Sequence, residues 1–169
     1  SSDLPFKAYC MYSKGGDSYA ILVRKDAKIE KIADLKDKKV AVPAGTAPAQ
    51  GLSQILLSAG LRPDSVKRVN ATYGSMGRML IQGQVEAMAG LEPFVTLTQD
   101  EMKGEAAVLT RMGRYVQGGG FFLISNAWAQ ANPKKVQDAV AALWESQQFV
   151  RKNPKEAAAI HAEFLKVEP

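Results

Sequence analysis

Residues 44–47, Ala-Gly-Thr-Ala, have the types and the spacing of an anion-binding turn. They follow an apolar run and precede a helical pattern, so they join the end of a strand to the start of a helix. At a helix start, free backbone N–H groups and the positive end of the helix dipole attract an anion. We expect Gly45, Thr46 and Ala47 to contact such a ligand, because glycine permits close approach and threonine adds a hydroxyl. The alternative is a helix cap that meets only water.

Two further segments follow predicted strands and are candidates for the same site. Glu92 and Pro93 come directly after an apolar strand, at the edge where open parallel sheets present ligands. The Glu92 carboxylate would accept a hydrogen bond from an amine on the ligand or pair with a nearby cation. Tyr73 and Ser75 stand at another strand-to-helix turn. We expect all four residues to line the ligand site.

Groups for catalysis or metal binding are few. The chain has one histidine, His161, and one cysteine, Cys10. His161 lies in a late amphipathic helical pattern, and Cys10 lies in an apolar stretch that is typical of a buried small side chain. A metal cluster, a Ser-His-Asp arrangement and an internal disulfide therefore have too few residues to draw on. We expect no cofactor and no enzymatic activity.

Composition excludes two other classes. The 169 residues carry 22 basic and 17 acidic side chains, a formal charge of +5. Because the two signs alternate through the richest stretch, residues 24–39, we expect a solvated surface and no nucleic-acid binding. No run of about 18 apolar residues occurs, so no membrane span is expected. The polar start is not a signal peptide, and we expect any export signal to have been removed.

Strand and helix patterns alternate through the first two thirds of the chain, which predicts an α/β fold with a mostly parallel open sheet. An additional strand at residues 121–125 follows three glycines with no helix before it. We expect this strand to run antiparallel to the others, beside residues 19–24. The other predicted strands lie at residues 19–24, 39–43, 66–69, 85–91 and 106–110, and predicted helices follow the second, third and fourth of these.

Two amphipathic helices close the chain, each introduced by Asn-Pro, at residues 132–133 and 153–154. The first places Val136, Val140 and Trp144 on one face. These apolar faces need a partner surface, and the predicted sheet is already covered by its own helices. We infer that the surface against which they pack lies outside this sequence.

The order and spacing of several segments resemble the solute-binding proteins of ABC importers for aliphatic sulfonates, taurine and nitrate, whose relatives bind pyrimidine precursors. The resemblance runs along nearly the whole chain. It is carried by residues 16–26 (GDSYAILVRKD), 32–46 (IADLKDKKVAVPAGT), 83–87 (GQVEA), 91–94 (LEPF) and 153–158 (NPKEAA).

The resemblance implies the type II periplasmic-binding-protein fold, in which two α/β lobes joined by two crossing segments hold the ligand between them. In this reading residues 1–17 are a remnant of the first lobe with the first crossing, residues 18–127 are the second lobe, and residues 128–169 return to the first lobe. The opening part of the first lobe would be absent. The resemblance places the crossings at the glycine clusters, so it predicts hinges at Gly15, Gly16, Gly118 and Gly119.

The function that the resemblance implies is the capture of a small anionic solute, such as a sulfonate, taurine or nitrate, for an ABC permease. The expected location is the periplasm, or a lipid anchor outside the membrane of a Gram-positive cell, with membrane contact only through the permease. Two alternatives stay open. One is an enzyme on the same scaffold, related to a desulfinase or to a thiamine-pyrimidine synthesis enzyme. The other is the effector-sensing domain of a transcription regulator, for which this sequence contains no helix-turn-helix.

Overall fold

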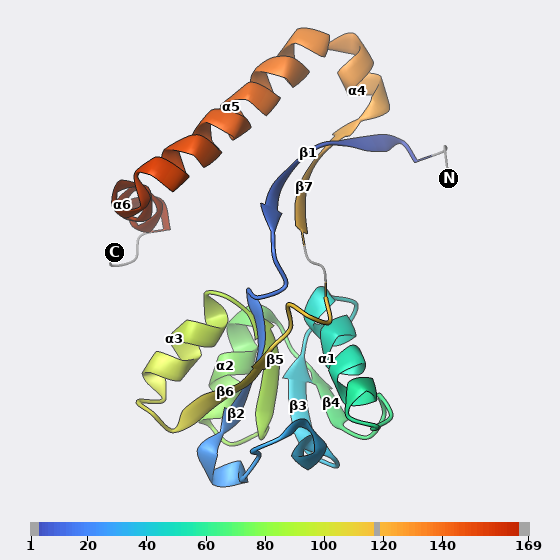
Figure 1. The fold of residues 1–169 in the computed structure, drawn as a ribbon, viewed down its shortest axis with the longest axis vertical. Helices are drawn as coiled ribbons and strands as arrows, with labels where there is room; N and C mark the ends of the chain where they lie inside the picture. Colours follow the sequence, from blue (N-terminus) through green and yellow to red (C-terminus); the bar gives the residue numbers. More distant parts are fainter. Residues whose placement is uncertain (1–3, 117–118, 166–169) are drawn as a thin grey trace. The chain divides into compact units, whose positions relative to one another are not determined.

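The computed structural model describes residues 4–116 and 119–165, which form two compact units (Figure 1). Unit 2 comprises Gly15–Gly118. Unit 1 comprises Ser1–Lys14 and Gly119–Pro169. The chain therefore begins in unit 1, completes unit 2 and returns to unit 1.

Unit 2 is built on a five-stranded sheet in the order β4-β3-β5-β2-β6. The pairs β3·β4 and β3·β5 are parallel, whereas β2 is antiparallel to both of its neighbours, β5 and β6. Four strands therefore run in one direction and β2 runs against them. The predicted α/β fold with a mostly parallel sheet is confirmed. The strands are β2 (Tyr19–Arg24), β3 (Lys39–Val42), β4 (Lys67–Asn70), β5 (Ala87–Leu91) and β6 (Ala106–Arg111).

Helices cover both faces of this sheet because its central strands are apolar on both sides. In β2, Ile21 and Val23 pack into one apolar cluster with α1 (Ala47–Ser58). The alternate residue Leu22 packs into a second cluster with α2 (Tyr73–Ile81) and α3 (Phe94–Glu101). Two short 3₁₀ helices, η1 (Lys25–Ala27) and η2 (Ile32–Leu35), connect β2 to β3, and Leu35 is fully buried in the first cluster.

The C-terminal ends of β3, β4 and β5 lie at one edge of the sheet (Figure 1). Val42 at the end of β3 pairs with Asn70 at the end of β4. The parallel pairing of β5 with β3 brings the turn after Leu91 to the same edge. The predicted placement of Thr46 and Glu92 at one end of the sheet is confirmed. This edge is called the C-terminal edge below.

Unit 1 combines a two-stranded antiparallel sheet with three helices. The strands are β1 (Phe6–Lys14) and β7 (Gly119–Ser125), which pair from Phe6↔Ser125 to Lys14↔Gly119. The helices are α4 (Asn126–Ala131), α5 (Pro133–Lys152) and α6 (Pro154–Leu165). A small buried cluster of Ile124, Ala129 and Val136 joins β7, α4 and α5.

The predicted position of residues 121–125 beside residues 19–24 is wrong. In the structure β7 pairs with β1 and belongs to unit 1. No edge of β2 is free to receive it, because β5 occupies one side of β2 and β6 the other. Unit 2 consequently ends at Gly118, and residues 119–127, predicted to belong to the second lobe, lie in unit 1.

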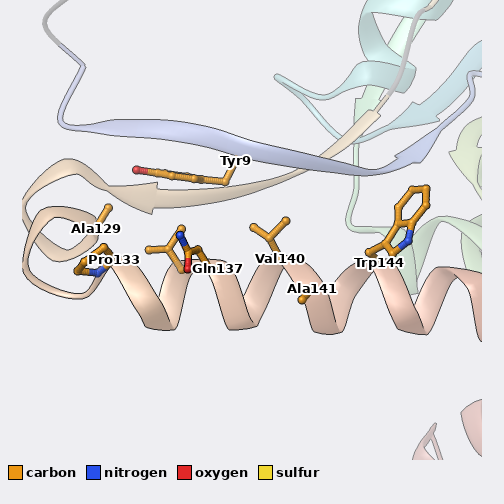
Figure 2. Close-up of a pocket in the computed structure, with 8 residues that line it drawn as sticks. Tyr9, Ala129, Pro133, Gln137, Val140, Ala141 and Trp144 are labelled. Atoms are coloured by element: carbon orange, nitrogen blue, oxygen red, sulfur yellow. The ribbon is translucent and has the colours of Figure 1, made fainter.

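Much of the apolar surface of unit 1 is solvent-exposed. Trp144 is 62% exposed and Phe164 is 82% exposed, and α5 has one buried residue, Val136, among those the structure describes. A groove of about 710 Å³ runs along α5 beneath Tyr9 of β1 (Figure 2). Its lining residues are Tyr9, Ala129, Pro133, Val136, Gln137, Val140, Ala141 and Trp144. Within residues 4–116 and 119–165, no helix is long and apolar enough to cross a membrane.

Candidate functional site

A pocket of about 530 Å³ lies at the C-terminal edge, between the ends of β3 and β4. It is bounded by the turn that leads into α1 and by the turn that opens α2. All seven of its lining residues are uncharged: Pro43, Ala44, Asn70, Ala71, Thr72, Tyr73 and Ser75. Because β3 and β4 are adjacent and parallel, the helices that follow them begin at the same edge of the sheet, although they cover opposite faces.

The predicted turn at residues 44–47 is a sharp entry into α1. Gly45 has φ +73°, which favours glycine, and Thr46 is the N-cap residue of α1. The Thr46 hydroxyl donates a hydrogen bond of 2.6 Å to the Pro43 carbonyl, so its single proton is already used within the turn. Gly45, Thr46 and Ala47 adjoin the pocket in sequence, but the pocket lining includes Ala44 and not these three residues.

The first turn of α2 contributes Tyr73 and Ser75 to the pocket. Both are among the residues predicted to line the ligand site, and the structure brings them together. The helix begins at Tyr73 with Thr72 as its N-cap. The Ser75 Oγ accepts the Thr72 N–H at 3.0 Å and lies 3.0 Å from the Thr72 Oγ1. The Ser75 hydroxyl therefore caps the backbone N–H of Thr72, and the two hydroxyl groups are within hydrogen-bond distance of each other. The aromatic ring of Tyr73 stacks on Phe94 with a centroid separation of 5.8 Å.

Asn70 connects the two turns. Its Oδ1 accepts the backbone N–H of Ala44 at 3.0 Å, from the end of β4 to the residue two positions beyond β3. The same side chain lines the pocket. This hydrogen bond holds the β3–α1 turn against the end of β4.

Glu92 and Pro93 lie on the same edge, but they do not line this pocket. The Glu92 carboxylate pairs with the guanidinium of Arg111, with an Oε1–Nη1 distance of 2.8 Å. It also accepts hydrogen bonds from the N–H and the hydroxyl of Thr96, at 3.0 and 2.8 Å. Of the two partners expected for Glu92, an amine on the ligand or a nearby cation, the structure shows the cation. Pro93 is the N-cap residue of α3.

The ionised form of Glu92 is favoured by these partners. Burial raises the pKa of Glu92, but hydrogen bonds from Arg111 and Thr96 outweigh it and hold the pKa below its usual value. Arg111 Nη1 also donates to the carbonyl of Asp17 at 2.9 Å. The pair thus fastens the β5–α3 turn to the segment that enters β2.

The predicted hinge glycines differ in their surroundings. Gly15 is exposed with φ +150°, and no described atom lies within 4 Å of where its Cβ would be. Gly16 is buried, and a Cβ there would overlap the carbonyl oxygen of Val116. Gly119 is the first residue of β7, paired with Lys14. Gly118 lies outside the described residues.

Cys10 and His161 lie in unit 1, and neither lines the pocket of unit 2. Cys10 is half-buried in β1 and His161 is exposed on α6.

Sequence reasoning missed two residues at this edge, Asn70 and Arg111. Asn70 follows the predicted strand at residues 66–69, and Arg111 follows the one at residues 106–110. Each is a polar residue directly after a predicted strand, so a search for polar residues at every predicted strand end would have found both.

Comparisons with known proteins give a consistent result. The family model described as "NMT1/THI5 like" matches residues 17–157. A protein of Escherichia coli (strain K12), provisionally named as an aliphatic sulfonates-binding protein, is 27% identical over 145 residues, which is 86% of this chain and 45% of that protein. This chain spans about half the length of the curated relatives that it matches.

Solved structures share the fold. The alkanesulfonate-binding protein SsuA from Xanthomonas axonopodis pv. citri, bound to MOPS, superposes with a TM-score of 0.82 at 22% identity, covering 99% of this chain and 57% of that one. SsuA from Escherichia coli gives 0.81 at 23% identity with the same coverage. The fold is therefore that of type II periplasmic binding proteins. Because the family model covers well over half of the sequence, the chain belongs to the NMT1/THI5-like family.

Proposed function

We propose that this chain is part of a solute-binding receptor that captures a small anionic solute at the C-terminal edge of unit 2. The observation that carries this proposal is the pocket between the starts of α1 and α2. The first turn of a helix has N–H groups without intrahelical partners, and its dipole favours negative charge. The start of α2 lines this uncharged pocket, and the turn that leads into α1 borders it.

The chemistry of the pocket favours a sulfonate or a comparable monoanion. Its seven lining residues carry no charge, so hydrogen-bond donors and helix dipoles supply the attraction. Arg111, at the end of β6 on the same edge of the sheet, does not line the pocket and is paired with Glu92. A singly charged group with several acceptor oxygens fits such donors better than a dianion, whose desolvation without a cation costs more.

The rest of the first lobe completes the receptor in this proposal. The relatives are about twice as long as this chain. The groove and exposed aromatic residues of unit 1 are then the surface that the rest of the first lobe covers, and the segments around Gly15 and Gly119 are the crossings. The partner of the closed receptor would be an ABC permease, and its location the periplasm or the outer face of the membrane.

The proposal is tested by placing a negative charge in the pocket. Ala44 is exposed and lines the pocket, and only its backbone N–H takes part in a described hydrogen bond. We expect Ala44→Asp to weaken the binding of ethanesulfonate at least about tenfold, because the new carboxylate would stand in the pocket lining and repel the negatively charged sulfonate. The affinity is measured by NMR titration of the 169-residue chain, which detects millimolar binding.

Ala59→Asp is the matched control, with the same change in charge at the other end of α1. It should bind ethanesulfonate within about twofold of the unmodified chain, because a charge about 18 Å away along the helix is screened by salt. Equal affinities in all three proteins would remove the pocket from the ligand site. Equal weakening in both variants would mean that the net charge of the chain, and not the pocket, determines the affinity for ethanesulfonate.

A further inference from the structure

We infer that Asn70 determines the polarity of the pocket, by accepting the Ala44 N–H with its oxygen and presenting its amide N–H₂ to the ligand. This inference rests on the proposed function and deepens it, because it names the side chain that makes the pocket select an acceptor-rich solute.

The orientation of the Asn70 amide follows from its partner. A backbone N–H can only donate, so the Asn70 atom 3.0 Å from the Ala44 nitrogen must be the carbonyl oxygen Oδ1. The other end of the amide is then the donor N–H₂, and Asn70 lines the pocket. An Asn held in this way offers two donor hydrogens and keeps its acceptor turned to the protein.

The other polar side chains of the pocket have less to offer. The Ser75 hydroxyl accepts the Thr72 N–H and lies within hydrogen-bond distance of the Thr72 Oγ1 and of the Thr72 carbonyl oxygen. The Thr46 hydroxyl, next to the pocket in sequence, donates to Pro43. Asn70 and Tyr73 are therefore the lining side chains whose donors the described hydrogen bonds leave available, and Asn70 offers two donor hydrogens against one from the Tyr73 hydroxyl.

Position in the sheet explains why this role falls to residue 70. Asn70 is the last residue of β4 and pairs with Val42, the last residue of β3. From there its short side chain reaches the N–H of Ala44, which leads into α1, while the backbone continues into Thr72 and α2. The Asn70 side chain thus links the two turns and also lines the pocket between them.

Asn70→Asp separates these two roles. Aspartate is nearly the same shape and keeps an acceptor for the Ala44 N–H, but it replaces the two donor hydrogens by a negative charge. We expect the binding of ethanesulfonate to the 169-residue chain at pH 7.5 to weaken by about 30-fold or more, with the Ala44 amide still protected from hydrogen exchange. The lost affinity should return in part as the pH is lowered, because a protonated carboxyl group regains a donor.

Asn70→Ala and Gln82→Glu complete the test. Asn70→Ala removes the acceptor, so the Ala44 amide should exchange faster. Gln82→Glu makes the same amide-to-acid change at the C-terminal end of α2 and should leave the affinity within about twofold.

The outcomes distinguish the inference from the proposed function. If the unmodified chain binds ethanesulfonate and Asn70→Asp binds it equally well, Asn70 is not the selecting residue, although the receptor proposal stands. If Asn70→Asp loses Ala44 protection together with affinity, the effect is structural and the inference is wrong. If the unmodified chain does not bind ethanesulfonate at all, the proposed function fails, and the inference fails with it.

Discussion

Replacement of Gly16 by alanine should lower the free energy of unfolding of unit 2 by about 3 kcal/mol. A Cβ at this position would overlap the carbonyl oxygen of Val116 and lie 2.9 Å from the Cα of Gly113. Both neighbours are backbone atoms, so no side-chain rotation relieves the overlap and the two segments must move apart. The segment that enters the sheet and the segment that leaves it are packed together at this point.

The measurement is urea denaturation followed by far-UV circular dichroism and by tryptophan fluorescence. Both tryptophans, Trp128 and Trp144, lie in unit 1, so their fluorescence reports on that unit. In Gly16→Ala, the part of the dichroism change that belongs to unit 2 should shift to lower urea, while the fluorescence transition stays in place.

Gly74→Ala is the control for Gly16→Ala. Gly74 lies within α2, and no described atom is within 4 Å of where its Cβ would be. This variant should be unchanged or more stable by less than about 1 kcal/mol. A Gly16→Ala protein as stable as Gly74→Ala would show that the two segments are not in close contact in solution.

Hydrogen exchange should separate the two units even more clearly. Val40, Ala41 and Val42 of β3 lie in the interior of the sheet and are 0 to 2% exposed. In α5, by contrast, Val136 is the buried residue and Trp144 lies open to solvent. We expect the amides of α5 and α6 to exchange at least about 100-fold faster, relative to their intrinsic rates, than those of β3. This ratio corresponds to a difference of about 2.7 kcal/mol in opening free energy.

The experiment needs the mass of the species in solution, measured by sedimentation equilibrium on the same sample. Equal, strong protection of α5 and β3 in a monomer would contradict the proposal that the apolar face of unit 1 needs a further surface. Equal protection in a dimer would show instead that a second copy covers that face, and would overturn its assignment to a first lobe.

Local patterns in the sequence predict most of unit 2. The apolar run at residues 39–43 becomes β3, and the glycine and threonine after it become the entry into α1 because φ at Gly45 is positive. The parallel arrangement follows from helical crossovers between successive strands. These features depend on residues close together in the chain, which is why the sequence alone indicates them.

Pairing over long distances is harder to predict. The strand after the glycine cluster has no local signal that distinguishes β1 from β2 as its partner. The choice is made by the sheet, in which β5 and β6 already occupy both edges of β2. The ion pair of Glu92 is similar, because Arg111 comes from β6 and its distance from Glu92 depends on the order β5-β2-β6.

Side-chain roles at the pocket also depend on partners that the sequence does not reveal. Thr46 and Ser75 have the types expected of ligand donors, but their hydroxyls stabilise the turns that carry them. Asn70, which has no motif around it, is the residue that spans the two turns. Residue types pointed to the turns that border the pocket, whereas hydrogen-bond partners determine which donors would remain for a ligand.

The central claim is that an anion binds at the C-terminal edge of unit 2, and a chemical-shift map tests it most directly. The ¹⁵N-labelled 169-residue chain is titrated with ethanesulfonate and, separately, with ethylammonium at the same ionic strength. We predict saturable shifts with ethanesulfonate that concentrate at residues 43–47 and 70–75, including the side-chain amide of Asn70, and no comparable shifts with ethylammonium. Saturable shifts elsewhere, or the same shifts with both ions, would contradict the claim.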